Sequence, residues 1–209
     1  MRGNTLQANS FVRGLYYWFK AIVRPGESID EFKSDPDKVV ISFWINLLFA
    51  FLYSLTALMG YLAGQEIMLE PWIPVAEKSY YLYQTFWTIP WGLATWVMLA
   101  GICHLLALAG KGKGYRYAYE DALLVVAIGW VLPWFVCGWL PETFFFMPLK
   151  VLPGALVEIV RLGVLPVIWQ TMLIATGLRK THEISWTKGI VIGFITNGVV
   201  FVMFVVFLR

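Results

Sequence analysis

The chain has 209 residues, of which 59% are hydrophobic and only 14% are charged. Soluble domains carry about a quarter charged residues, so this composition and a mean hydropathy of +0.69 exclude an ordinary soluble fold. Five helical spans of about 20 residues would take up roughly half of the chain and leave no room for a separate catalytic domain. The net charge of +3 comes from basic residues beside the apolar runs, which indicates contact with anionic lipid and no nucleic-acid partner.

Residues 1–37 are predicted to form a cytoplasmic segment at the membrane interface, ahead of a transmembrane domain over 38–209. Within this segment, residues 11–23 mix aromatic and aliphatic side chains with Arg13 and Lys20. A helix of this composition lies in the plane of the interface, with its apolar face toward the acyl chains. The sequence therefore predicts a short interfacial helix over 11–23.

A second short helix is predicted after the Arg-Pro-Gly sequence at 24–26, which ends the first one. Ser28 followed by Glu31 matches the start of a capping box. The helical turn that begins there is expected to end near Asp35, before Pro36.

Five apolar runs are long enough to cross the hydrocarbon as helices, which takes about 20 residues at ~1.5 Å per residue. The first two runs carry no formal charge over 27 and 32 residues if histidine is neutral. Pro90 is expected to kink the second span and Pro133 to break the third, since proline removes a backbone donor. The predicted spans cover residues 39–63, 82–109, 120–140, 157–178 and 188–208.

The distribution of lysine and arginine sets the predicted orientation of the spans. With a cytoplasmic N-terminus, twelve of the 16 basic residues fall on the cytoplasmic side. The first loop on the other side is acidic, with Glu66, Glu70 and Glu77. We therefore expect an all-α bundle of about five transmembrane helices, with its N-terminus inside and its C-terminus outside.

Basic residues next to the cytoplasmic ends of the spans are predicted to bind lipid headgroups. The glycine-rich loop at 110–114 carries two lysines, but it lacks the order of a phosphate-binding loop and does not follow a strand. It is interpreted as a flexible basic turn at an anionic surface. The predicted headgroup contacts are Lys111, Lys113, Arg116, Arg179 and Lys180.

A few polar residues fall inside the spans or at their edges, where each is costly unless it faces the bundle interior or water. They are Asn46, His104, Gln170 and Asn197 within the spans, Glu120 and Asp121 at the cytoplasmic edge, and Glu158 and Arg161 at the outer edge. Two interpretations stay open, namely hydrogen bonds between packed helices and a polar pathway for a substrate or ion. The three-residue spacing of Glu158 and Arg161 also predicts an ion pair within one helix.

Glycines at helical spacing predict faces where two helices approach closely. GxxxG patterns occur twice, and His104 shares a stripe of mostly small residues in the second span. An exposed face of this kind would also support a homo-oligomer. The glycines assigned to helix packing are Gly60, Gly64, Gly101, Gly189 and Gly193.

The residue types needed for a metal centre or an active site do not form a recognisable pattern. Cys103, His104, Glu120 and Asp121 lack a known ligand spacing, and His182 is distant in the sequence. The chain contains no nucleophile elbow, HExxH motif or arrangement of paired carboxylates. The sequence therefore predicts no metal, no cofactor and no catalytic activity.

Short motifs stand near the ends of the apolar runs. They are Arg24-Pro25 followed by Phe32 and Asp35-Pro36, His104-Leu105-Leu106 before the glycine-rich turn, Tyr119-Glu120-Asp121-Ala122, and Trp169-Gln170 with Gly177-Leu178 before His182 and Ser185. Together they resemble the Yip1 family of multi-span membrane proteins, in particular its prokaryotic branch. The resemblance implies five spans and a cytoplasmic N-terminus, in agreement with the charge distribution.

The resemblance implies little about activity. Eukaryotic members of the family resemble trafficking factors that contact small GTPases, and this chain carries no recognisable GTPase-binding motif. We expect a non-enzymatic protein of a prokaryotic cytoplasmic membrane that organises membrane lipids or an unknown partner protein. The alternative is a small transporter or channel with a polar pathway around His104 and Gln170.

Overall fold

The computed structural model describes residues 9–65, 76, 79–110, 119–149 and 154–207. These residues form helices joined by turns, without a strand among them, and the predicted all-α fold is confirmed. In chain order, with η marking π-helical turns, the helices are α1 (Ser10–Val23), α2 (Pro25–Lys33), α3 (Lys38–Leu62), α4 (Tyr80–Ala109), α5 (Tyr119–Gly129), α6 (Val131–Trp134), η4 (Phe135–Trp139), η5 (Glu142–Phe146), α7 (Met147–Leu149), α8 (Ala155–Glu158), η6 (Ile159–Val164), α9 (Leu165–His182) and α10 (Trp186–Phe207).

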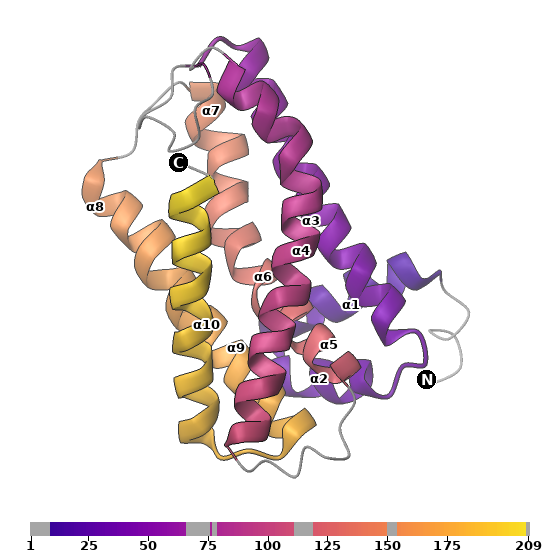
Figure 1. Cartoon of the computed structure of the whole chain (residues 1–209). Helices are drawn as coiled ribbons and strands as arrows, with labels where there is room; N and C mark the ends of the chain where they lie inside the picture. Colours follow the sequence, from indigo (N-terminus) through magenta and orange to yellow (C-terminus); the bar gives the residue numbers. More distant parts are fainter. Residues whose placement is uncertain (1–8, 66–75, 77–78, 111–118, 150–153, 208–209) are drawn as a thin grey trace.

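Five helical stretches are long and apolar enough to span a membrane. They stand side by side in an elongated bundle (Figure 1). The end at which α3 begins and α4 and α9 finish is called the α1 end, and the opposite one is called the far end. The stretches are Lys38–Leu62, Tyr80–Ala109, Tyr119–Phe146, Leu156–His182 and Trp186–Met203.

The third span runs further than the sequence predicts. It continues past Pro133 and past the expected end at residue 140, through η4 and η5, to Phe146. The two π-helical segments follow Pro133 and Pro141 closely. Proline has no N–H to bond to the carbonyl one turn earlier, and a wide turn lets the backbone re-form its hydrogen bonds around that gap. Helix α4 also continues through a proline, Pro90, but it stays α-helical.

The second short helix begins earlier than the capping-box pattern predicts. α2 starts at Pro25, at a helical position where a missing N–H costs nothing. Ser28 lies inside the helix, and its hydroxyl donates to the carbonyl of Tyr17 in α1 at 2.7 Å. The prediction of a helix start at Ser28 is therefore wrong, because proline sets the start about one turn before it.

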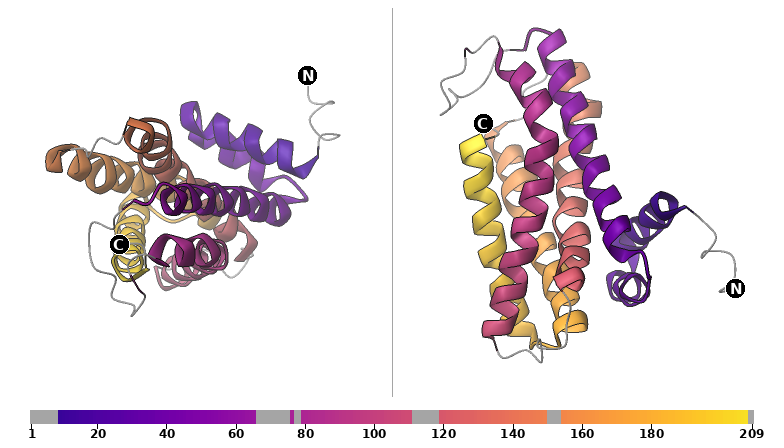
Figure 2. Two further views of the ribbon diagram at one scale, coloured as in Figure 1. Left: turned by 90° about the horizontal axis from the view of Figure 1, so that it is seen from above. Right: turned by 45° about the vertical axis from the view of Figure 1, so that its right-hand side comes forward.

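Helices α1 and α2 lie against the side of the bundle at its α1 end (Figure 1). Seen from above, α1 shows its whole length whereas α10 is seen close to end-on, so α1 runs across the axis of the bundle (Figure 2). When the spans cross a membrane, a helix in this orientation lies along the membrane plane. The helix predicted over 11–23 is present as Ser10–Val23.

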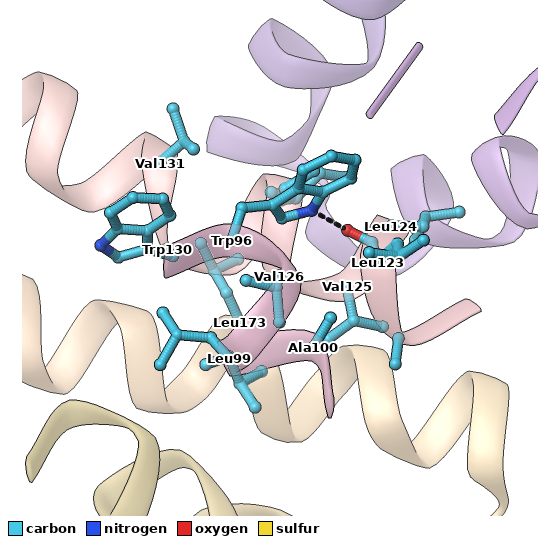
Figure 3. Packing of buried hydrophobic residues seen from close by; sticks show 14 of the residues in the cluster. Trp96, Leu99, Ala100, Leu123, Leu124, Val125, Val126, Trp130, Val131 and Leu173 are labelled. Atoms are coloured by element: carbon cyan, nitrogen blue, oxygen red, sulfur yellow. Dashed lines mark hydrogen bonds between the residues drawn. The ribbon is translucent and has the colours of Figure 1, made fainter. Parts of the chain in front are cut away.

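The core of the bundle centres on α5, which is buried from Asp121 to Gly129. Helices α3, α4 and α9 pack around it. Its aliphatic side chains belong to the hydrophobic cluster shown in Figure 3, where the Trp96 indole of α4 donates to the Leu123 carbonyl at 2.8 Å. The hydrogen bond gives the buried indole a partner and fixes α4 against α5.

Two glycines bring α5 and α9 into close contact. A Cβ placed on Gly129 would lie 2.8 Å from the Ile174 side chain, and one placed on Gly177 would lie 2.6 Å from the Val125 side chain. Neither distance leaves room for a real side chain. The small residues thus let two helix backbones approach, as they do in other membrane helix pairs.

The GxxxG pattern of α10 packs directly against α9. A Cβ on Gly193 would lie 2.9 Å from the Thr171 Cα, and one on Gly189 would lie 3.0 Å from the Ala175 Cα. Because these neighbours are backbone atoms, they cannot move away as a flexible side chain could. Glycine at both positions therefore sets the distance between the last two spans.

The other glycines assigned to packing have different surroundings. A Cβ on Gly60 would lie 3.4 Å from the Tyr81 ring, so Gly60 is at a helix contact. Gly64 lies beyond the end of α3 with φ of +65°, and it ends the helix instead of packing it. A Cβ on Gly101 would meet no atom within 4 Å, so this glycine is not at a helix contact within the described chain. Spacing alone does not show which face of a helix meets a neighbour.

The contact between α9 and α10 predicts a difference between two Gly→Ala variants. G193A forces a methyl group against the Thr171 backbone, and we expect a loss of about 1–3 kcal/mol in the free energy of unfolding. G101A adds the same methyl group to open space in a helix, where alanine is slightly preferred, so its stability should be unchanged or higher. Thermal unfolding in mild detergent measures both. Equal stability of the two variants would contradict the packing described for α10.

Candidate functional site

Arg13 of α1 is buried and binds the segment that joins α2 to α3. Its Nη1 donates to both carboxylate oxygens of Asp35 at 2.9 Å, and its Nη2 pairs with Asp37. Only 8% of the Arg13 side chain and 1% of the Asp35 side chain are exposed. A bidentate pair of this kind fixes the orientation of both partners, so it fastens α1 to the start of α3.

Tyr17, one turn after Arg13, binds the same carboxylate. Its hydroxyl donates to Asp35 Oδ2 at 2.9 Å, and its ring stacks on Phe32 of α2 with the centroids 4.7 Å apart. Burial raises the pKa of Tyr17, and the hydrogen bond to Asp35 acts in the same direction. The phenol therefore stays protonated at physiological pH and remains a donor in this network.

One face of α1 packs against the bundle. The rings of Trp18 and Phe135 lie 4.5 Å apart between centroids, and Ala21 is fully buried. A Cβ on Gly14 would lie 3.2 Å from the Ile41 side chain, so the glycine lets α1 sit close to α3. This face joins α1 to the first and third spans.

The opposite face of α1 is apolar and exposed. Val12, Tyr16, Phe19 and Val23 are 53%, 43%, 60% and 78% exposed. Their spacing of three or four residues places them on one side of the helix. α1 thus has two apolar faces, and the bundle covers only one of them.

A lysine joins the first and third spans at the α1 end. Lys38 at the start of α3 binds Asp121 at 2.6 Å and lies 3.9 Å from Glu120. Both carboxylates belong to the first turn of α5, where negative charge also suits the helix dipole. Asp121 is buried, and Lys38 supplies the opposite charge that its burial requires.

The last turn of α9 is held by α2. Lys180 pairs with Asp30, and Lys33 donates to the carbonyl of Lys180 at 2.9 Å. A cation at the C-terminal carbonyls of a helix is favourable for the same electrostatic reason. The α2 helix therefore connects α1 to the fourth span.

The structure describes two of the five residues that are predicted to bind lipid headgroups, Arg179 and Lys180. Lys180 is engaged with Asp30, as described above. The guanidinium of Arg179 lies 4.8 Å from the centre of the Trp186 ring, in a cation–π contact at the start of α10. The remaining three, Lys111, Lys113 and Arg116, lie outside the described residues.

His104 and His182 meet at the α1 end although they are distant in the sequence. His104 Nδ1 lies 3.1 Å from His182 Nε2, and His182 Nδ1 lies 2.8 Å from the Thr181 hydroxyl. That hydroxyl donates its single proton to the Gly177 carbonyl at 2.9 Å, so it accepts from His182. His182 then accepts from His104, so neutral His104 carries its proton on Nδ1 and its lone pair on Nε2. The sequence does not reveal this pair, because the two residues are 78 positions apart. The packing of α4 against α9 brings the two rings into contact.

The amide side chains inside the bundle serve separate helix contacts. Gln170 is fully buried and accepts from the Trp134 indole at 2.8 Å. Asn197 of α10 donates to the Thr171 hydroxyl of α9 at 2.9 Å, and Asn46 donates to a carbonyl of its own helix. Each of these three amides therefore bonds a different partner, and the two contacts of Gln170 and Asn197 join neighbouring helices.

Arg161 is buried at the far end and binds two carboxylates. Its Nη2 lies 2.7 Å from Glu158 and 3.1 Å from Glu142, and its Nη1 donates to the Gly138 carbonyl at 3.0 Å. The ion pair with Glu158 is the one that the sequence spacing predicts. Glu142 belongs to the third span, so no spacing within one helix could reveal it.

The residues that sequence reasoning missed share one property. Asp35, His182 and Glu142 each pair with a residue from another helix, so their partners depend on how the helices are arranged. The first two stand in the motifs near the ends of the apolar runs, and that position was the available signal. No group of three or more His, Cys, Asp or Glu residues suited to a metal ion occurs among the residues searched, which are those that the structure describes.

Span-length apolar helices with paired charges at both ends define an integral membrane protein of the polytopic helical class. The model of the Yip1 domain matches residues 19–208, so the chain belongs to the Yip1 family. No curated protein and no solved structure matches the chain.

The Arg13–Asp35 pair predicts that one substitution releases α1 from the bundle. D35N leaves a buried guanidinium without its main partner, and breaking a buried pair costs about 3–5 kcal/mol. In a background with Cys103 and Cys137 replaced, Cys at position 21 should be protected from a small thiol reagent. D35N should speed its labelling at least about tenfold.

E27Q is the matched control, because Glu27 pairs only at the exposed surface of the same two helices. It should leave the labelling rate unchanged. The same rate in D35N as in the unsubstituted background would show that the ion pair does not hold α1.

The histidine contact predicts a specific tautomer. In neutral protein, His182 should carry its proton on Nδ1 and His104 should also carry its proton on Nδ1, which the nitrogen chemical shifts of labelled histidine report. T181V removes the acceptor for His182 Nδ1 and should change the shifts of both rings. A spectrum that shows both histidines protonated on Nε2 would contradict this assignment, because the two hydrogen bonds would then run in the opposite direction.

Proposed function

We propose that the protein is a non-enzymatic scaffold that organises the lipids of one membrane leaflet by holding α1 in the interface as a wedge. The observation that carries the proposal is the outward stripe of Val12, Tyr16, Phe19 and Val23 on a helix fastened by a buried ion pair. An exposed apolar stripe on a helix along the membrane plane is stabilised by insertion among the acyl chains. Membership of the Yip1 family supports a role in the membrane itself.

Because α1 is fixed to the bundle, its insertion affects the membrane at a defined position beside the spans. A helix on a flexible tether can enter or leave the interface without affecting the rest of the protein. α1 is instead held by Arg13 on one side and packed through Trp18 on the other. When its stripe inserts, α1 therefore occupies one leaflet as a helix parallel to the membrane plane, at a fixed distance from the spans.

Charge has a minor part in this insertion. Residues 10–37 contain four basic and five acidic side chains, and the described pairs join Arg13, Lys20 and Arg24 to carboxylates. A polybasic helix attracts anionic lipid, whereas this segment is close to neutral. Burial of the apolar stripe is therefore the main driving force. We propose that the stripe enters the cytoplasmic leaflet of a prokaryotic cytoplasmic membrane, in line with the N-in orientation that the sequence predicts.

The alternative of a transporter or channel has less support. Its pathway would have to pass His104 and Gln170, and Gln170 is fully buried with its oxygen bonded to Trp134. The cavity beside α3 and α4 is lined mainly by apolar and aromatic residues, among them Phe49, Trp91 and Trp130. Such linings suit packed helices better than a path for ions.

The wedge predicts a preference for curved membranes. Purified protein reconstituted together with vesicles of two diameters should distribute toward the smaller ones, because strong curvature opens space between headgroups for an inserted helix. The double variant V12S/F19S removes the bulk of the stripe and should reduce the preference at least about twofold. Fluorescence per unit of lipid in single vesicles measures the distribution.

L105S is the control, because Leu105 is also exposed, at 65%, near the α1 end but on a span. It should keep the preference for small vesicles. The proposal that α1 acts as a wedge would be refuted if the unsubstituted protein showed no preference for small vesicles. It would also be refuted if V12S/F19S kept the full preference.

A further inference from the structure

We draw no further inference here: the strongest candidate, the apolar groove between the start of α1 and the first span that is lined by Phe11, Trp44, Leu47, Leu48 and Phe51, is an unpartnered apolar face, and nothing in the structure shows what covers it.

Discussion

Hydrocarbon offers no hydrogen-bond partners, so a polar group that the chain brings into the membrane is costly unless it is paired within the molecule. The spans satisfy their backbones as helices, and Arg13 and Arg161 each bind two carboxylates. These ion pairs lie at opposite ends of the bundle, and α5 between the ends is enclosed by other helices. Charge at the two ends and apolar packing between them is the arrangement expected of a helical membrane protein.

The position of α1 follows from the same constraint. An exposed ion pair contributes about 0–1 kcal/mol, whereas removing one partner of a buried pair costs about 3–5 kcal/mol. Arg13 and Asp35 are of the buried kind, so α1 is a fixed part of the fold and not a loose tether. The function proposed above assigns the second apolar face of this fixed helix to the acyl region beside the bundle.

Hydropathy and length predict the five spans and the helix at 11–23, because both depend on the residues of one segment. Contacts between segments cannot be read in this way. The pairs His104–His182 and Arg161–Glu142 depend on which helices are neighbours, and the open space around Gly101 depends on which face of α4 turns outward. The start of α2 could have been predicted, since Pro25 is itself a signal for a first helical position. The third span continues past its two prolines, and a π-helical segment follows each of them closely.

The function proposed for α1 requires this helix to lie in the membrane interface with its stripe toward lipid. Spin labels placed one at a time along residues 12–23 in nanodiscs measure this directly, through their accessibility to oxygen in the bilayer and to a water-soluble nickel chelate. Oxygen accessibility should rise at 12, 16, 19 and 23 and fall between them, with low access to nickel at these four positions. High nickel access along the whole exposed face would place α1 in water and contradict its role as a wedge.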